Sequence, residues 1–284
     1  ASDVYKRQVF RFEGQPIDMA LIYAARGICP SVGYWHSPFA KGPNYLPLLR
    51  SNKPIKPFAN HRLSKPMPNE MIASKGICEQ TLRGIGFPKK KIRLCSALRS
   101  FRAIKITNQR KGKPQKRYFQ NLNKNNPKVF LACSADPKEN LGLIYAFQKA
   151  LDCLPKTNLI FRPHPACEAS KNHLNLFKSN SKITTFRLAT DTNFHFDLLG
   201  SDALVLGGSS LAFEAIALGV MPVVYESTVA FSACSMKSFG KSLFVVHSAE
   251  EMVKGIMASL YQHKTWHLRT KTWSELLREL SLGN

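Results

Sequence analysis

Acidic residues, paired cysteines and long apolar runs are all scarce in this chain. Of its 284 residues only 18 are Asp or Glu, against 41 Lys or Arg, so the formal net charge is +23. No apolar run approaches the roughly 20 residues that span a bilayer, so the sequence does not predict an integral membrane protein. The seven cysteines are odd in number and none has Cys-x-x-Cys spacing, which argues against a disulfide framework or a zinc site and for a reducing compartment. No Asp-x-Asp triplet occurs either, so we expect neither a metal nor another cofactor.

An initiating methionine is missing too. Ala1–Gln8 looks like the translation of an adapter used in sequencing libraries, so we interpret residues 1–8 as a non-native scar. We therefore expect a natural N-terminus of unknown length before Val9, and interpret the rest as the C-terminal part of a longer protein.

What the chain does contain is enough apolar material for a folded core. Hydrophobic residues make up 44% and aromatics 10% of the sequence, which excludes a disordered protein. After Pro127, short β-rich apolar runs alternate with helical stretches, the pattern of a parallel sheet covered on both faces. The expected strands are Val129–Cys133, Leu159–Phe161, Ile183–Phe186, Ala203–Leu206, Val223–Tyr225 and Leu243–Val246, and the expected helices are Leu141–Leu151, Leu211–Leu218 and Glu250–Leu260. We predict a Rossmann-like α/β domain over residues 128–263, followed by a C-terminal helix within 264–284.

The earlier part of the chain carries fragments of the same pattern. Helices are expected at Asp18–Arg26 and Glu79–Ile85, and strands at Ser31–Tyr34, Met71–Ala73 and Lys91–Leu94. We interpret residues 9–106 as the remainder of a first Rossmann-like domain, truncated at its N-terminus, and the polar stretch 107–127 as a linker. Two such domains would form a cleft that faces the carboxyl ends of both sheets, where α/β folds bind ligands.

Positive charge is concentrated in residues 50–117, which we call the basic zone. It holds 19 Lys or Arg and only two acids, Glu70 and Glu79. Such a zone favours polyanions, which include nucleic acid, an anionic membrane and phosphorylated substrates. A solvated surface without a specific partner is the plain alternative. Nucleic-acid binding is the main rival function, although the zone has no recognised binding motif and no regular aromatic residues for base stacking.

The strongest chemical signal lies between the expected strand Ala203–Leu206 and the helix that follows it. Gly207 and Gly208 let backbone approach a ligand closely, and Ser209 and Ser210 add hydroxyls to the amides of a helix start, which together suit a phosphate. Glu214 follows one helical turn after Ser210 and could accept hydrogen bonds from ribose hydroxyls. The alternative is that Ser209 or Ser210 simply caps the helix.

Three further signals carry ionisable or donor groups. Arg162-Pro163-His164-Pro165 directly follows a strand, so the prolines would hold His164 rigidly where it and Arg162 can contact a phosphate; a rigid surface turn is the alternative. His36 closes another expected strand and suits a general base, or a purely structural role. Glu13, on an expected loop before a helix, is a second candidate catalytic acid or base, or a residue favoured by the helix dipole.

Together these motifs resemble the donor-nucleotide half of GT-B glycosyltransferases of bacterial surface-carbohydrate biosynthesis. Arg162–Pro165 and Ser201–Ser210 are similar to motifs of CDP-glycerol glycerophosphotransferases and of sialyltransferases with His-Pro and Ser-Ser motifs. Trp35–Pro38 is similar to the Trp-His-Gly motif of the glycerophosphotransferases. The chain departs from their pattern at two places: Ser37 stands where they have Gly, and Gly207-Gly208 stands where they have an acidic–aromatic pair. Phe12–Arg26 and several later stretches are similar to poorly characterised surface-carbohydrate proteins.

The resemblance implies an enzyme that moves a sugar, or a glycerophosphate-type group, from a nucleotide donor to a glycan or lipid-linked acceptor. It implies that His164, Ser209 and Ser210 contact the donor phosphates, that Glu214 lies near the ribose, and that His36 or Glu13 acts as base. We expect a cytoplasmic protein that the basic zone could hold on the inner face of the bacterial inner membrane. A sugar-nucleotide 2-epimerase of the same fold is the third-ranked possibility, because its pattern of catalytic carboxylates is not evident.

Overall fold

The computed structural model divides into two units that are described separately. It describes residues 7–12, 16–35, 67–74, 77–84, 87–95, 126–167, 171–190, 194–218, 220–227 and 244–261. The first unit holds the described residues up to 95, and the second holds those from 126 onward. Most of the expected linker and all of residues 264–284 lie outside the described residues.

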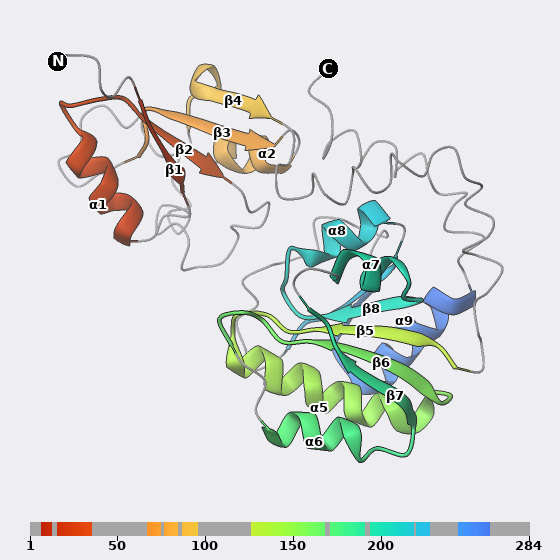
Figure 1. Ribbon diagram of the computed structural model, residues 1–284. Coiled ribbons are helices and arrows are strands. Elements are labelled where there is room, and N and C mark those ends of the chain that lie inside the picture. Colours follow the sequence, from red (N-terminus) through yellow and green to blue (C-terminus); the bar gives the residue numbers. More distant parts are fainter. Residues whose placement is uncertain are drawn as a thin grey trace. The chain divides into compact units, whose positions relative to one another are not determined.

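The first unit is built on a parallel four-stranded sheet with the order β1-β2-β3-β4. Its strands are β1 (Gln8–Arg11), β2 (Ser31–Trp35), β3 (Glu70–Ser74) and β4 (Ile92–Cys95), and its helices are α1 (Pro16–Ala25) and α2 (Ile77–Gly84), with a short 3-10 turn at Lys89–Lys91 (Figure 1). All the elements expected here are confirmed to within two residues. The sequence prediction missed β1, which begins within the stretch interpreted as a scar.

The core of the first unit forms between its sheet and its helices. Phe12, Trp35, Met71 and Leu82 are buried there. Gly33 in the middle of β2 is required by this packing, because a Cβ at that position would lie 2.7 Å from Cγ of Pro68. β2 is therefore closely covered where it approaches its carboxyl end.

The second unit is a parallel six-stranded sheet with the order β10-β9-β8-β5-β6-β7. Its strands are β5 (Lys128–Ala132), β6 (Thr157–Arg162), β7 (Ile183–Leu188), β8 (Ala203–Leu206), β9 (Pro222–Tyr225) and β10 (Phe244–Val246). Its helices are α5 (Pro137–Cys153), α6 (Lys171–Lys178), α7 (Phe194–Leu199), α8 (Leu211–Leu218) and α9 (Ala249–Tyr261). Every strand and helix expected in this unit is confirmed, whereas the short helices α6 and α7 were missed.

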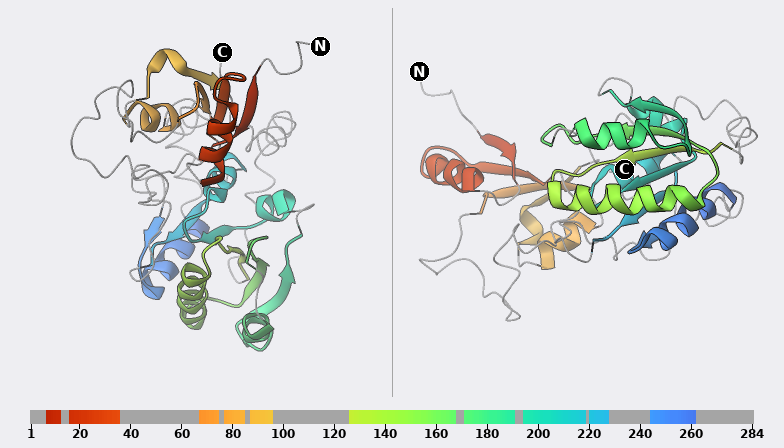
Figure 2. Two further views of the ribbon diagram at one scale, coloured as in Figure 1. Left: turned by 90° about the vertical axis from the view of Figure 1, so that its left-hand side faces the viewer. Right: turned by 90° about the horizontal axis from the view of Figure 1, so that it is seen from below.

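Helices cover both faces of this sheet, as continuous apolar strands require. Side chains of α5, α6 and α9 pack with Val129 and Leu131 of β5 in one core. Figures 1 and 2 show α7 and α8 on the opposite side of the sheet from α5 and α6. The fold class is thus α/β with two Rossmann-like parallel sheets. Among the described helices, none is long and apolar enough to cross a membrane.

Candidate functional site

The two motifs singled out in the sequence of the second unit begin level with one another on the same edge of the sheet. Arg162 ends β6 and Leu206 ends β8, and both pair with Ala132 of the intervening strand β5. All three strands are parallel, so the two loops leave the sheet at its carboxyl edge. Two strand spacings separate them, about 10 Å. This is the edge where ligands of open α/β sheets bind.

The loop after β8 is held by a carboxylate from the first turn of α5. Oε1 of Glu139 accepts a hydrogen bond from the Gly208 amide at 2.7 Å. Gly207 packs so tightly on the same side chain that an added Cβ would lie 2.8 Å from Cδ of Glu139. The glycines therefore do permit a close approach, and in this structure the group that approaches is Glu139.

Burial dominates the protonation of Glu139. The residue is 3% exposed, and desolvation raises the pKa of its carboxyl group, while hydrogen bonds from Ser134 and Gly208 oppose that shift. The group therefore holds its proton more firmly than an exposed glutamate. The sequence analysis did not single out this buried carboxyl group at the carboxyl edge of the sheet.

Asn140, the next residue, reaches the other loop. Its Oδ1 accepts from the Ser134 amide at 2.7 Å, and its Nδ2 donates to the Ser134 carbonyl at 2.9 Å and lies 3.6 Å from Sγ of Cys167. The Cys167 amide in turn donates to the His164 carbonyl at 2.8 Å. The first turn of α5 thus connects the loops that carry the two motifs.

Cys133, which follows β5 at the same edge, is not suited to nucleophilic chemistry. Burial, followed by the nearby Cys167 and Glu139, raises the pKa of its thiol to about 12. The thiol stays protonated at neutral pH, and a protonated thiol is a poor nucleophile.

His164 has a defined ring orientation. Its Nδ1 accepts a hydrogen bond from the Ala166 amide at 3.1 Å, so in the neutral ring the proton is on Nε2. Nε2 is then the atom that could donate to an anion. The turn after β6 closes at Cys167, whose backbone bridges back to His164.

The serine pair lies at the start of α8. Oγ of Ser209 accepts from the Leu211 amide at 3.3 Å, the capping interaction that the alternative interpretation expected. Ser209, Ser210 and Gly208 are all partly exposed, although the Gly208 amide is engaged by Glu139. Contacts of Ser209 and Ser210 with a phosphate remain a prediction.

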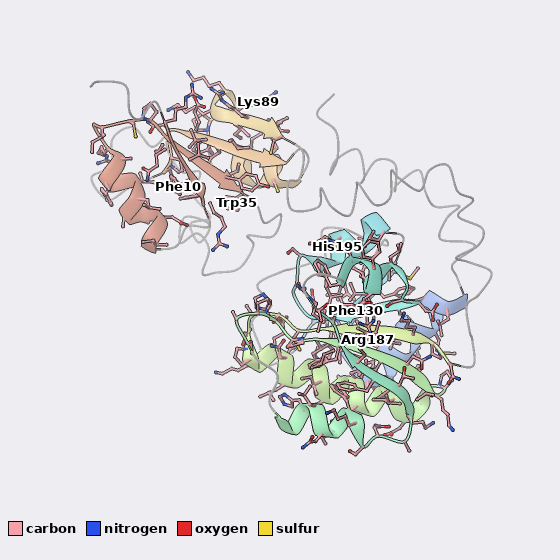
Figure 3. All side chains as sticks on the ribbon, viewed as in Figure 1. Phe10, Trp35, Lys89, Phe130, Arg187 and His195 are labelled. Atoms are coloured by element: carbon pink, nitrogen blue, oxygen red, sulfur yellow. The ribbon has the colours of Figure 1, made fainter. Side chains whose placement is uncertain are left out.

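Glu214 lies on the first turn of α8, where its carboxylate pairs with a histidine. Its Oε2 accepts a hydrogen bond from Nε2 of His195, on α7, at 2.9 Å, and both side chains are 6% exposed. Figure 3 labels His195 on this helix. The neighbouring Phe194 ring is tilted against the His195 ring, with centroids 3.8 Å apart, and the Arg162 guanidinium lies 4.2 Å above the centre of the Phe194 ring. Arg162 and Glu214 are thus linked through two residues of α7.

Sequence reasoning missed four residues of this arrangement: Glu139, Asn140, Phe194 and His195. The pair in α5 had a usable signal, because polar residues shortly after a buried strand lie at the same edge as the two recognised motifs. The α7 pair had none, since that helix spans only six residues. His36 and Glu13, expected as catalytic residues, lie outside the described residues. Within the described ranges no group of three His, Cys, Asp or Glu side chains could hold a metal.

Comparison with solved structures gives the fold. The chain is similar to a UDP-GlcNAc 2-epimerase from Neisseria meningitidis bound to UDP-GlcNAc, with TM-score 0.58, 15% identity, and coverage of 97% of this chain and 71% of that one. The fold is that of GT-B-type enzymes. A Methanocaldococcus jannaschii UDP-GlcNAc 2-epimerase in complex with UDP-GlcNAc and UDP has TM-score 0.57 and 15% identity, covering 95% of this chain and 76% of that one. A Burkholderia multivorans trehalose 6-phosphate synthase has TM-score 0.56 and 14% identity, covering 93% and 66%.

Comparisons of sequence add nothing further. No family model matches this chain, and no curated protein matches it. The resemblance to GT-B-type enzymes therefore stands at the level of fold. The finer resemblance to glycerophosphotransferases and sialyltransferases stays a prediction.

Proposed function

We propose that this chain binds a nucleotide-activated sugar at the carboxyl edge of its second sheet and transfers the sugar to a surface-polysaccharide acceptor. One observation carries the proposal: Arg162 and Leu206 lie level on either side of β5, so the Arg-Pro-His-Pro and Gly-Gly-Ser-Ser loops leave the sheet side by side. The names of structures with this fold support the substrate class, since two of them contain UDP-GlcNAc.

The chemistry of the residues suits a phosphate leaving group. Arg162, His164 and the hydroxyls of Ser209 and Ser210 would neutralise the charge that develops on the donor phosphate, and such preorganised electrostatics is usually the largest catalytic contribution. Glu214 would accept hydrogen bonds from the ribose. His36 or Glu13 would remove the proton of the acceptor hydroxyl, a step that contributes about 10²–10⁴-fold.

A 2-epimerase acting on the same class of substrate is the second candidate. The two structures that contain UDP-GlcNAc are both 2-epimerases by name, and the buried acid Glu139 supplies one carboxyl group for acid–base chemistry. Incubating the protein with UDP-GlcNAc alone separates the two functions. A 2-epimerase forms the isomeric sugar nucleotide, visible by NMR, whereas a transferase releases the nucleotide only when an acceptor is present.

Donor binding is tested by thermal unfolding with CMP, CDP and UDP. At about 100 times the dissociation constant, a nucleotide adds about 2.7 kcal/mol, so we expect one of them to raise the melting temperature by about 5–10 °C. His164→Ala should abolish most of this rise. Lys156→Ala is the matched control. It removes an exposed basic side chain directly before the first residue of β6, at the other end of this strand from His164.

Two results would contradict the proposal. The first is that no nucleotide stabilises the protein. The second is that a nucleotide stabilises His164→Ala and Ser209→Ala as much as the unaltered chain, because the ligand would then bind elsewhere.

A further inference from the structure

Two consecutive residues at the start of α7 face two of the proposed ligand-binding side chains. Phe194 lies under the guanidinium of Arg162, at 4.2 Å, and His195 donates to the carboxylate of Glu214, at 2.9 Å. Arg162 and Glu214 come from different elements, the end of β6 and the first turn of α8. A single short helix therefore contacts both.

From this geometry we infer that Phe194 and His195 are positioning residues for nucleotide recognition: Phe194 orients Arg162 toward the donor phosphate, and His195 orients Glu214 toward the ribose. The inference rests on the proposed function. It adds that recognition of phosphate and of ribose is set by adjacent residues of one helix rather than by each loop separately.

The position of α7 is itself well defined. Asp197, three residues after Phe194, accepts two hydrogen bonds from the Arg187 guanidinium of β7, at 2.8 and 2.6 Å. Such a two-pronged contact fixes orientation as well as distance. The Phe194 and His195 rings are neighbours on this helix, with centroids 3.8 Å apart, and each faces a different side chain of the proposed site.

His195 acts on Glu214 through one nitrogen. Among the described residues its other nitrogen, Nδ1, has no hydrogen-bond partner. The hydrogen bond that the His195 ring makes among these residues is therefore the one to the Glu214 carboxylate. A Gln at position 195 can place its amide nitrogen near the position of Nε2, whereas the shorter Asn cannot. These two substitutions form a matched pair that separates the hydrogen bond from the mere presence of a polar side chain.

The readout for His195 is the preference for ribose over deoxyribose. We expect the unaltered chain to bind UDP or CDP at least about tenfold more tightly than the 2′-deoxy form, measured by calorimetry, because a group built to bond a hydroxyl rejects a ligand without it. His195→Asn should lower that preference to the value of Glu214→Ala, and His195→Gln should keep it. In the Glu214→Ala background, His195→Asn should cause no further change.

The readout for Phe194 is the contribution of the nucleotide's phosphates to its binding affinity. Phe194→Leu should weaken binding of UDP or CDP by about 3- to 10-fold and leave the ribose preference unchanged. In an Arg162→Ala background the same substitution should have no effect. Unfolding in urea would reveal whether His195→Asn folds. If it does not, the Phe194 substitutions still test whether α7 positions the binding side chains.

The outcomes separate the two claims. If no nucleotide binds the unaltered chain, the proposed function is wrong and the positioning roles fall with it. If nucleotides bind, but His195→Asn keeps the ribose preference or Phe194→Leu acts independently of Arg162, the site stands and the inference is overturned.

Discussion

Glu139 is a buried carboxyl group whose partners are a backbone amide and a hydroxyl. Its Oε1 accepts from the Gly208 amide at 2.7 Å, and the Ser134 hydroxyl adds a second hydrogen bond. Desolvation outweighs these contacts, because it is the largest cause of the raised pKa. The side chain therefore orders the loop after β8 at an electrostatic cost to the folded state.

That cost predicts a pH dependence. Since burial raises the pKa of Glu139 above its ordinary value of 4.5, the folded protein binds this proton more tightly than the unfolded chain does. The contribution of Glu139 to stability is thus most favourable below pH 4.5 and declines as the pH rises through the folded-state pKa. Glu139→Gln removes this titration, so its stability relative to the unaltered chain should increase with pH.

The measurement is urea unfolding of both proteins from about pH 4 to about pH 7. Asp152→Asn is the control, an exposed acid on the same helix, and its difference from the unaltered chain should not follow this trend. A Glu139→Gln difference that is constant or falls with pH would contradict the raised pKa.

Gly207 shows the limit of reading single residues from the sequence. Two glycines after a strand correctly indicate that something approaches the backbone closely. The approaching group, Glu139, is 68 positions earlier in the chain, so only the folded structure brings it to within 2.8 Å of a Cβ at Gly207. The pattern predicted the space but not the side chain that fills it.

At the scale of the elements, a side chain just before β8 aligns the start of this strand with the start of β5. Asp202, just before β8, accepts from the Lys128 amide at 2.7 Å, and its own amide donates to the Lys128 carbonyl at 2.8 Å. This reciprocal contact sets the register of two strands whose far ends carry the site. In the first unit, Asn69, just before β3, and Ser31, the first residue of β2, make a comparable contact.

Removing the Asp202 side chain should therefore destabilise the second unit. Asp202→Ala leaves the Lys128 amide without its carboxylate acceptor, which should cost about 1–3 kcal/mol. Asp202→Asn keeps an oxygen acceptor and loses a charge that burial disfavours, since desolvation is the main cause of the raised pKa of Asp202. We expect Asn to cost less than Ala in denaturant unfolding; equal losses would show that the acceptor is not what matters.

Two of the elements that escaped prediction, β1 and α7, are short. β1 has four residues, and α7 has six. Periodicity needs a longer window to distinguish a helix or strand from a loop. Their stability comes from packing and pairing, as with β1 against β2, so tertiary structure decides whether they form.

For the whole chain, the formal net charge of +23 predicts binding to anionic vesicles. Each basic residue near an anionic surface adds about 1 kcal/mol. Lys89, Lys90 and Lys91 are exposed, and replacing all three by Gln should weaken binding by up to about 100-fold at low salt. The control replaces three separated exposed lysines of the second unit, Lys138, Lys156 and Lys178, with the same change in charge.

Sedimentation of the protein with vesicles, with and without anionic lipid, measures this vesicle binding. Equal binding to neutral vesicles would contradict an electrostatic attachment.

Filter binding to nucleic acid over a salt series tests the rival function. Affinity that falls steeply with salt, without nucleotide-sugar binding, would favour the rival.

The sequence by itself determined the α/β class, the order of most strands and helices in the second unit, and the two strand-end motifs. These depend on local periodicity and on the identity of residues that follow apolar runs, which are properties of short windows. Only the tertiary structure decided that the motifs flank β5, that Glu139 and Asn140 connect them, and that α7 links Arg162 to Glu214. Those contacts join residues far apart in sequence, and burial and strand pairing bring them together.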